Sequence, residues 1–167
     1  MTEDIDQKEF RTALGNFATG VVIVTTMSDG LPEGMTIGAF TSVSLAPPLV
    51  AFLPAQSSVT WPKIRAAGKF AINILSNDQE GTCMAFARTS GTKFDGVNWD
   101  MSHNGTPHLA GALAWLDCTL DQVFSAGDHD IALGRVVSLT HGDAGAPLVF
   151  YRGKFHNIHA QDVAQHI

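Results

Sequence analysis

The feature that most constrains this chain is a series of short, strand-like segments separated by turns, without regular alternation of strands and helices. The first segment, residues 21–26 (Val-Val-Ile-Val-Thr-Thr), is β-branched and largely apolar, which is typical of a strand buried on both faces. Such a series favours a closed or partly open antiparallel barrel over a dinucleotide-binding sheet of alternating strands and helices. The other strand candidates are residues 33–44, 48–53, 69–75, 114–124, 131–139 and 147–155.

Short helices are expected beside these strands. The first follows a capping box opened by Asp6, presents Phe10, Leu14 and Phe17 on one face, and stops near Gly20. A long polar segment without strand or helix patterning, residues 89–107, is expected to be an ordered excursion that serves a site or an interface. Two further helices are expected over residues 58–67 and 76–88, the second opened by another capping box at residues 76–79 (Ser-Asn-Asp-Gln).

Size and charge narrow the class of protein. One domain is expected over residues 1–167, with a core at about 10–157. The net charge of −6 argues against nucleic-acid binding, and no uninterrupted apolar run of about 18 residues predicts a membrane span. The acidic start argues against a secretory signal, and two lone cysteines, Cys83 and Cys118, suit reduced thiols in the cytoplasm. Only 16% of residues are charged, against about 25% in soluble domains, which hints that a partner or ligand covers apolar surface.

Several motifs with known chemistry are missing from the sequence. There is no glycine-rich dinucleotide or P-loop fingerprint and no nucleophile elbow. His156 and His159 lie three residues apart but have no companion ligand at a convincing spacing, so no metal is expected. His103 and His108 lie in the polar excursion with no partner that spacing identifies.

Two clusters of small hydroxyl residues are candidate ligand contacts. Residues 34–44, Gly-Met-Thr-Ile-Gly-Ala-Phe-Thr-Ser-Val-Ser, would let main-chain groups approach a planar polar ligand, although on composition alone an ordinary edge strand is the better explanation. Residues 56–60, Gln-Ser-Ser-Val-Thr, open a helix, where free N–H groups and hydroxyls suit a phosphate. Arg88 could add a bidentate contact to that phosphate or serve only as a cation at a helix C-terminus.

Two later segments carry weaker signals. Gly127, Asp128 and His129 form a turn at the start of a strand, which would expose the imidazole at the rim of a barrel. Residues 148–155 read as a hairpin with aromatic and basic side chains.

Taken in order over residues 10–157, these segments resemble the flavin reductase family. The resemblance is carried by residues 16–25, 34–48, 70–75, 93–94, 127–129 and 147–153. It implies an antiparallel Greek-key split β-barrel that binds FMN, with a few short peripheral helices. It also implies an NAD(P)H:flavin oxidoreductase that passes a hydride from NADH or NADPH to FMN or FAD and supplies reduced flavin to a partner monooxygenase. The chain departs from the family pattern at Gly38, where relatives often have Ser, and at Ala46, where many have Asp.

The resemblance also assigns residues. His129 would dock the nicotinamide dinucleotide and is the one residue placed in the catalytic machinery. Residues between Thr36 and Ser44 would line the flavin ring. The serine-rich turn at residues 57–60 would hold the ribityl chain and phosphate together with Arg88. The motifs at residues 127–129 and 151–153 would flank the mouth of the site. The expected cofactor-binding residues are Thr36, Ile37, Gly38, Ala39, Thr41, Ser42, Val43, Ser44, Ala55, Ser57, Ser58, Thr60, Arg88, Gly127, Asp128, Tyr151, Arg152 and Gly153.

Two other functions remain open at this point. One is a split-barrel oxidoreductase with tightly bound prosthetic FMN, although such enzymes generally need more basic residues than the 10 Lys and Arg of this chain. The other is a non-catalytic flavin-binding module. Split barrels of this kind pair as homodimers with flavin near the subunit junction, so the low charge content is expected to reflect surface covered by a second subunit and by flavin.

Overall fold

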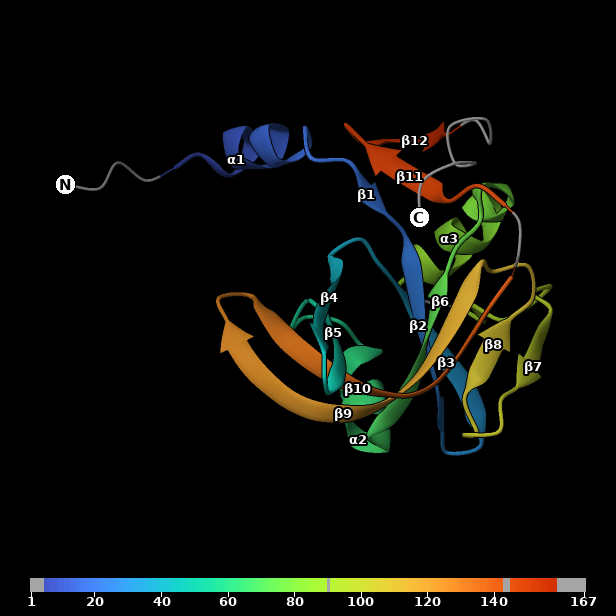
Figure 1. Cartoon of the computed structure of the whole chain (residues 1–167). Helices are drawn as coiled ribbons and strands as arrows, with labels where there is room; N and C mark the ends of the chain where they lie inside the picture. Colours follow the sequence, from blue (N-terminus) through green and yellow to red (C-terminus); the bar gives the residue numbers. More distant parts are fainter. Residues whose placement is uncertain (1–4, 90, 143–144, 159–167) are drawn as a thin grey trace.

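The core of the molecule is an antiparallel barrel. The computed structural model describes residues 5–89, 91–142 and 145–158, and places seven strands in the order β3-β2-β6-β9-β10-β5-β4. Every neighbouring pair in this order is antiparallel, as the sequence predicts. The fold is mainly β, and Figure 1 shows the long β9–β10 hairpin curving around the barrel. The strands are β2 (Val22–Ser28), β3 (Leu31–Ile37), β4 (Phe40–Leu45), β5 (Pro48–Phe52), β6 (Lys69–Ile74), β9 (Ala114–Ala126) and β10 (His129–His141).

Two small sheets accompany the barrel. In the first, β1 (Thr19–Gly20) pairs with β11 (Leu148–Tyr151), which forms a hairpin with β12 (Lys154–Asn157). In the second, β7 (Trp99–Met101) lies within the polar excursion and pairs with β8 (Pro107–Leu109), which begins at the last residue of the excursion. The composition of the excursion does not predict this strand pair.

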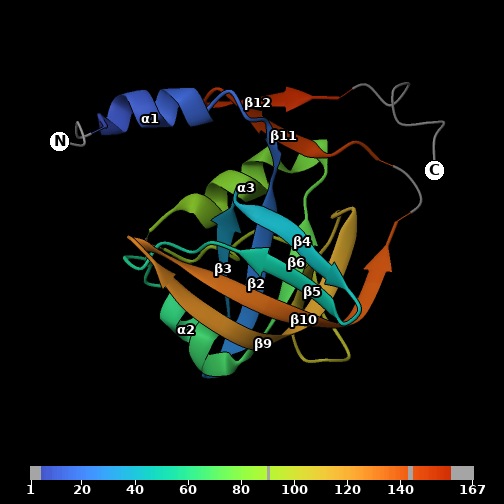
Figure 2. The same ribbon diagram turned by 60° about the vertical axis from the view of Figure 1, so that its left-hand side comes forward.

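Short helices lie around the barrel, as the sequence predicts. Figure 2 shows α3 between the barrel and the β11–β12 hairpin, with α2 at the opposite end. The helices are α1 (Gln7–Leu14), α2 (Trp61–Ala67) and α3 (Glu80–Ala87), the last preceded by one 3₁₀ turn (Asn77–Gln79). The second capping box is present, because Ser76 and Gln79 satisfy each other's backbone N–H groups at this turn.

The first helix is shorter than predicted. Asp6 caps it by accepting the N–H groups of Lys8 and Glu9, but it ends at Leu14 and not near Gly20. The side-chain amide of Asn16 donates to the carbonyls of Thr12 and Ala13, which satisfies acceptors of the last turn and stops the helix. Residues 19–20 are then free to pair with β11.

The predicted strand over residues 33–44 is also wrong in its extent. The structure divides it into β3 and β4, which lie at opposite ends of the strand order and are separated by Gly38 and Ala39. A small-residue corner lets the chain pass from one edge of the barrel to the other, which no period-2 pattern can reveal.

Two apolar clusters hold these layers together. The first fills the barrel, where Phe52 packs edge-on against Trp61 of α2 and Phe70 of β6, with ring centroids 5.6 and 5.2 Å apart. The second lies between the barrel and α3 and includes Ile23 and Phe86. Because β2 contributes to both clusters, residues 21–26 are buried throughout, as their sequence predicts.

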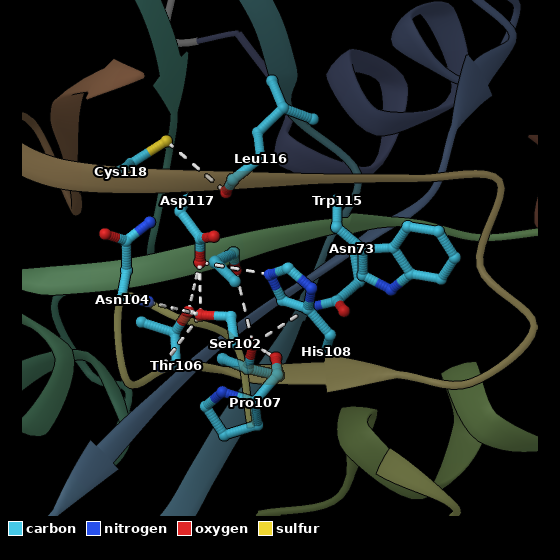
Figure 3. A network of polar contacts seen from close by, with 12 residues as sticks. Asn73, Ser102, Asn104, Thr106, Pro107, His108, Trp115, Leu116, Asp117 and Cys118 are labelled. Carbon is cyan, nitrogen blue, oxygen red and sulfur yellow. Dashed lines mark hydrogen bonds and ion pairs between the residues drawn. The ribbon is translucent and has the colours of Figure 1, made fainter. Parts of the chain in front are cut away.

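A polar network fastens the excursion to the barrel (Figure 3). The buried carboxylate of Asp117 on β9 accepts hydrogen bonds from the hydroxyls of Ser102 and Thr106, and Nε2 of His108 lies 3.1 Å from its Oδ1. The His108 ring stacks on Trp115, with centroids 5.9 Å apart and planes 18° apart. Asp117 is thus the partner of His108 that spacing alone does not identify.

In the described part of the chain, no helix is both long and apolar enough to cross a membrane.

Candidate functional site

The turn before α2 forms one wall of a small cavity that we call the serine cavity. Its volume is about 250 Å³, and the end of β3 and the end of α3 complete its lining. Serine hydroxyls, a guanidinium and an ammonium group all meet here, which suits an anion. The cavity brings together six of the predicted site residues, namely Thr36, Ala55, Ser57, Ser58, Thr60 and Arg88.

The hydroxyl groups of the serine cavity have different tasks. Ser58 Oγ accepts the backbone N–H groups of Thr60 and Trp61, each at 3.2 Å, and so satisfies the first N–H group of α2. Thr36 donates to the carbonyl of Cys83 at 2.8 Å, which ties β3 to α3. Ser57 is exposed and has no side-chain hydrogen bond among the described residues, so its hydroxyl is available to a ligand.

Lys93 is a site residue that the sequence-based prediction leaves out. Its Nζ donates to the carbonyl of Gly34 at 3.0 Å and to the hydroxyl of Thr60 at 3.1 Å, which brings the ammonium group to the wall of the serine cavity. Burial lowers the pKa of Lys93, because a partly dehydrated ammonium group is less stable than a solvated one. The only sequence signal is its place in the Lys-Phe pair at 93–94, within a long polar segment.

A larger cavity, which we call the histidine cavity, opens where α1 approaches the β9–β10 turn and the β11–β12 hairpin. Its volume is about 870 Å³. Phe10 and Leu14 of α1 supply apolar lining, while Arg11 and Arg152 bring two guanidinium groups. It contains five predicted site residues, namely Ala39, Asp128, His129, Arg152 and Gly153.

The Gly-Asp-His turn has the predicted shape. Gly127 adopts φ 67°, a conformation that favours glycine, and His129 then begins β10 with its side chain 44% exposed. The imidazole Nδ1 lies 2.7 Å from Oδ1 of Asp128. This hydrogen bond lowers the pKa of Asp128, and it also fixes the imidazole ring at the rim of the cavity.

Arg152 is held in place rather than free. Its Nε donates to Oδ1 of Asn16 at 2.9 Å, and its backbone N–H donates to the carbonyl of Gly15 at 3.0 Å. The guanidinium carbon also lies 5.2 Å from the ring centroid of Tyr151. These contacts link the end of α1 to the β11–β12 turn, so both margins of the histidine cavity are connected.

Backbone hydrogen bonds join the two cavities. Ala55, which lines the serine cavity, pairs with His129 in an antiparallel bridge. On either side of this bridge, the backbone N–H of Gln56 donates to the carbonyl of Asp128 at 2.9 Å, and the backbone N–H of Asp130 donates to the carbonyl of Pro54 at 3.0 Å. The serine-rich turn and the Gly-Asp-His turn are therefore held together by backbone hydrogen bonds.

The remaining predicted residues do not line these two cavities. Ile37 is buried in the barrel core, so its side chain cannot reach a ligand at the surface. Thr41, Ser42, Val43 and Ser44 lie on β4, the last strand of the sheet order, where a register shift between Ser42 and Ser44 takes Val43 out of the ladder. Gly38, Gly127 and Tyr151 lie next to lining residues without lining either cavity themselves.

Comparisons with known proteins agree with one another. A family model described as "Flavin reductase like domain" matches residues 14–159. The chain is 50% identical over 152 residues to a flavin reductase from Pseudomonas putida, covering 90% of this chain and 89% of the relative. It is 45% identical over 156 residues to the reductase subunit HsaB of a flavin-dependent monooxygenase from Rhodococcus jostii, covering 93% and 80%.

A solved structure is similarly close. The NADH:FAD oxidoreductase SgcE6 from Streptomyces globisporus, in complex with NAD and FAD fragments, matches with a TM-score of 0.89 at 36% identity. The match covers 95% of this chain and 96% of that one.

Proposed function

The chain belongs to the flavin reductase family, and we propose that its serine and histidine cavities are the two halves of one active site. The protein is an NAD(P)H-dependent flavin reductase, which passes a hydride from a nicotinamide to FMN or FAD and supplies reduced flavin to a monooxygenase. In our proposal the serine cavity holds the flavin phosphate and the histidine cavity holds the nicotinamide dinucleotide. The observation that carries this assignment is the Ala55–His129 bridge, which sets the two cavities side by side.

The donors present in the structure fit a flavin phosphate. Ser57 offers an unengaged hydroxyl, and Arg88 and Lys93 supply two cations at the same cavity. The other part of the flavin is its planar, polar ring, which needs main-chain hydrogen-bonding groups along its edge. At the end of the sheet order, β4 pairs on one side with β5, so the N–H and C=O groups of its outer edge are available to such a ring.

Bound flavin supplies the hydride acceptor, and the protein supplies position and electrostatics. Arg11 and Arg152 line the histidine cavity and suit the pyrophosphate of a dinucleotide. His129, fixed by Asp128, would dock the dinucleotide so that the two rings reach a near-attack distance of roughly 3–3.5 Å. Main-chain N–H groups near residues 42–44 would stabilise negative charge that arrives on the flavin ring.

The experiment that tests the site compares flavins with and without a phosphate. Arg88→Gln should raise the KM for FMN about tenfold, because a bidentate charged contact is lost, and should leave the KM for riboflavin unchanged. Steady-state NADH oxidation measures both constants. An equal change in the KM values for FMN and riboflavin would contradict the placement of the flavin phosphate in the serine cavity. A failure of NADH to bleach FMN under anaerobic conditions would contradict the reductase activity itself.

We also infer that the protein acts as a homodimer. No residue of α1 is buried, and Phe10, Leu14 and Phe17 are 53%, 57% and 78% exposed. Leu45 at the end of β4 is 94% exposed. Exposed apolar side chains in this number suit a second copy of the chain, and three of them, Phe10, Leu14 and Phe17, line the histidine cavity. Light scattering at micromolar concentration tests this inference, and a monomer would contradict it.

We infer a cytoplasmic location from the thiols. Cys83 and Cys118 are both buried and unpaired, which suits a reducing compartment where NADH is also available.

A further inference from the structure

Asn16 uses both ends of its side-chain amide to join two distant parts of the chain. It lies two positions after the last residue of α1, and its Oδ1 accepts N–H groups from Nε and Nη2 of Arg152, the first at 2.9 Å. Its Nδ2 donates to the carbonyls of Thr12 and Ala13, each at 3.1 Å. Arg152 belongs to the turn between β11 and β12, so one amide fixes this turn to the end of α1.

The backbone at Arg152 indicates that an arginine side chain is needed at this place. β11 and β12 are joined by a two-residue turn, Arg152 and Gly153, whose φ angles are 49° and 76°. Asn and Gly adopt such positive φ values readily, whereas a longer side chain does so at a cost in stability. In the described part of the chain, the other non-glycine residue with positive φ is Asp29, of a type that tolerates this region. An unfavourable conformation kept at the margin of a cavity points to a functional side chain.

The contact with Asn16 leaves one edge of the Arg152 guanidinium group available. Of its five N–H donors, Asn16 engages one on Nε and one on Nη2. The N–H groups that remain lie on Nη1 and Nη2, and together they can donate to two oxygens of a phosphate. No carboxylate of residues 5–89, 91–142 or 145–158 forms an ion pair with Arg152. Arg152 therefore brings an ordered, unneutralised cation to the histidine cavity that it lines.

An amide at position 16 makes these contacts without cancelling the charge of Arg152. An aspartate could accept the same two N–H groups, but its negative charge would neutralise the guanidinium. It also could not donate to the carbonyls at the end of α1, where a negative charge is unfavourable. An alanine would leave the guanidinium free to rotate. Asn16 thus fixes the position of the cation and preserves its charge.

We propose that Asn16 is a positioning residue for the nicotinamide dinucleotide, because it holds Arg152 with a free edge available to the pyrophosphate. Asn16 does not itself line the histidine cavity, so it acts through Arg152 and not by contact with the substrate. Arg152 is ordered before the dinucleotide arrives, and binding then does not have to restrict a long, flexible side chain. The inference rests on the proposed function, which places the dinucleotide in the histidine cavity.

Two substitutions separate the position of the cation from its charge. Asn16→Ala frees the guanidinium and should raise the KM for NADH about fivefold, because binding must then order this side chain. Asn16→Asp neutralises the guanidinium and should raise this KM about tenfold or more. In both variants kcat and the KM for FMN should stay within twofold of the values for the unchanged protein, as expected when only dinucleotide binding is weakened. Steady-state NADH oxidation measures all of these constants.

Thr12→Ala is the matched control on the same helix. It removes the hydrogen bond from the Thr12 hydroxyl to the carbonyl of Lys8, 2.8 Å long, and leaves the main-chain carbonyl that Asn16 needs. All constants of this variant should equal those of the unchanged protein.

A double-mutant cycle tests whether Asn16 acts through Arg152. Arg152→Asn removes the guanidinium and introduces a residue type that suits a φ of 49°. It should raise the KM for NADH about tenfold. In this background Asn16→Ala should have no further effect, because no guanidinium is left to position.

The outcomes separate this inference from the proposed function. If Arg152→Asn raises the KM for NADH but Asn16→Ala does not, or if Asn16→Ala has its full effect without Arg152, the positioning role is wrong. An equal rise in the KM values for FMN and NADH would also overturn it, since Asn16 would then only stabilise α1. If Arg152→Asn leaves the KM for NADH unchanged, the dinucleotide does not lie where the proposed function places it. Failure of NADH to reduce FMN would contradict the reductase activity itself.

Discussion

Asp130 Oδ2 lies 2.8 Å from the indole Nε1 of Trp61, so the strand that begins with His129 is tied to the helix that follows the serine-rich turn. The other carboxylate oxygen accepts a hydrogen bond from the side-chain amide of Gln56 at 2.9 Å. One carboxylate therefore joins elements from both halves of the proposed active site. We regard Asp130 as a positioning residue, since it lines neither the serine cavity nor the histidine cavity.

Asp130→Asn should loosen this junction. An asparagine can accept at one oxygen only, so its NH₂ group must face either the Trp61 or the Gln56 donor. We expect a melting temperature about 5 °C lower. The KM values for flavin and nicotinamide should rise together, which a loss of stability alone would not cause. Gln56→Ala is the companion variant, because it leaves the Trp61 contact intact while it removes an amide that also donates to Ser125 and to the carbonyl of His129. Unchanged KM values in Asp130→Asn would contradict the positioning role.

The Asp130 carboxylate should also make the melting temperature depend on pH. Hydrogen bonds from Trp61 and Gln56 lower the pKa of Asp130 in the folded protein. A lowered carboxyl pKa contributes stability above the unfolded value of about 3.9, and this contribution is lost as the pH falls through the folded value. The melting temperatures of the unchanged protein and Asp130→Asn should therefore differ most near pH 7 and converge in acid. A constant difference from pH 7 down to pH 3 would contradict this account.

His129 is expected to act in binding. Its imidazole lies at the rim of the histidine cavity and is fixed by Asp128, with no other titratable partner among the described residues. His129→Ala should raise the KM for NADH about tenfold and change kcat little, as the loss of uniform binding does. Steady-state kinetics at saturating FMN measures both constants. An unchanged KM with an abolished kcat would assign His129 a role in the chemical step.

Much of the barrel follows from local patterns in the sequence. The buried run at residues 21–26 and the capping box at 76–79 both occur as predicted, because each depends on residues a few positions apart. The division of residues 33–44 into β3 and β4 could not be predicted in this way. It depends on the pairing of β4 with β5, beside which the backbone N–H of Leu53 donates to the carbonyl of Ala39.

In the candidate site too, local motifs can be predicted from the sequence but long-range contacts cannot. The serine-rich turn and the Gly-Asp-His turn stand out in sequence, but their pairing through Ala55 and His129 joins residues 74 positions apart. Arg11 lies in a segment whose pattern carries no site signal, and the polar segment that contains Lys93 does not single out this residue. Their roles arise because tertiary packing brings α3 beside β3 and places α1 beside the β11–β12 turn.

Gly34 is needed for close packing of α3 on β3. A Cβ atom at this position would lie 2.6 and 2.8 Å from two ring carbons of Phe86, which is buried. Gly34→Ala should therefore destabilise the fold by about 1–3 kcal/mol through overpacking. Gly20→Ala is the matched control, because nothing lies within 4 Å of the place that its methyl group would take on β1. Urea unfolding compares the two, and equal stability of both variants would contradict the packing argument.

Asp117 should stabilise the excursion in a pH-dependent manner. Burial alone raises the pKa of this carboxyl, but hydrogen bonds from Thr106, Asn104 and Ser102, together with nearby His108, outweigh burial and lower it. Its stabilising contribution is therefore present above the unfolded pKa of about 3.9 and is lost as the pH falls through the folded pKa.

Asp117→Asn tests this role. The variant replaces charge-assisted hydrogen bonds by neutral ones and should lower the free energy of unfolding at pH 7 by about 1–3 kcal/mol. The loss should shrink in acid, where the unchanged carboxyl becomes protonated as well. His108→Gln is the control, since an amide N–H can still donate to Asp117. Because none of these residues lines the serine or the histidine cavity, the KM values for FMN and NADH should stay unchanged. Urea unfolding from pH 3 to pH 7 decides the matter, and a loss of equal size at both ends of that range would show that Asp117 contributes packing and not charge.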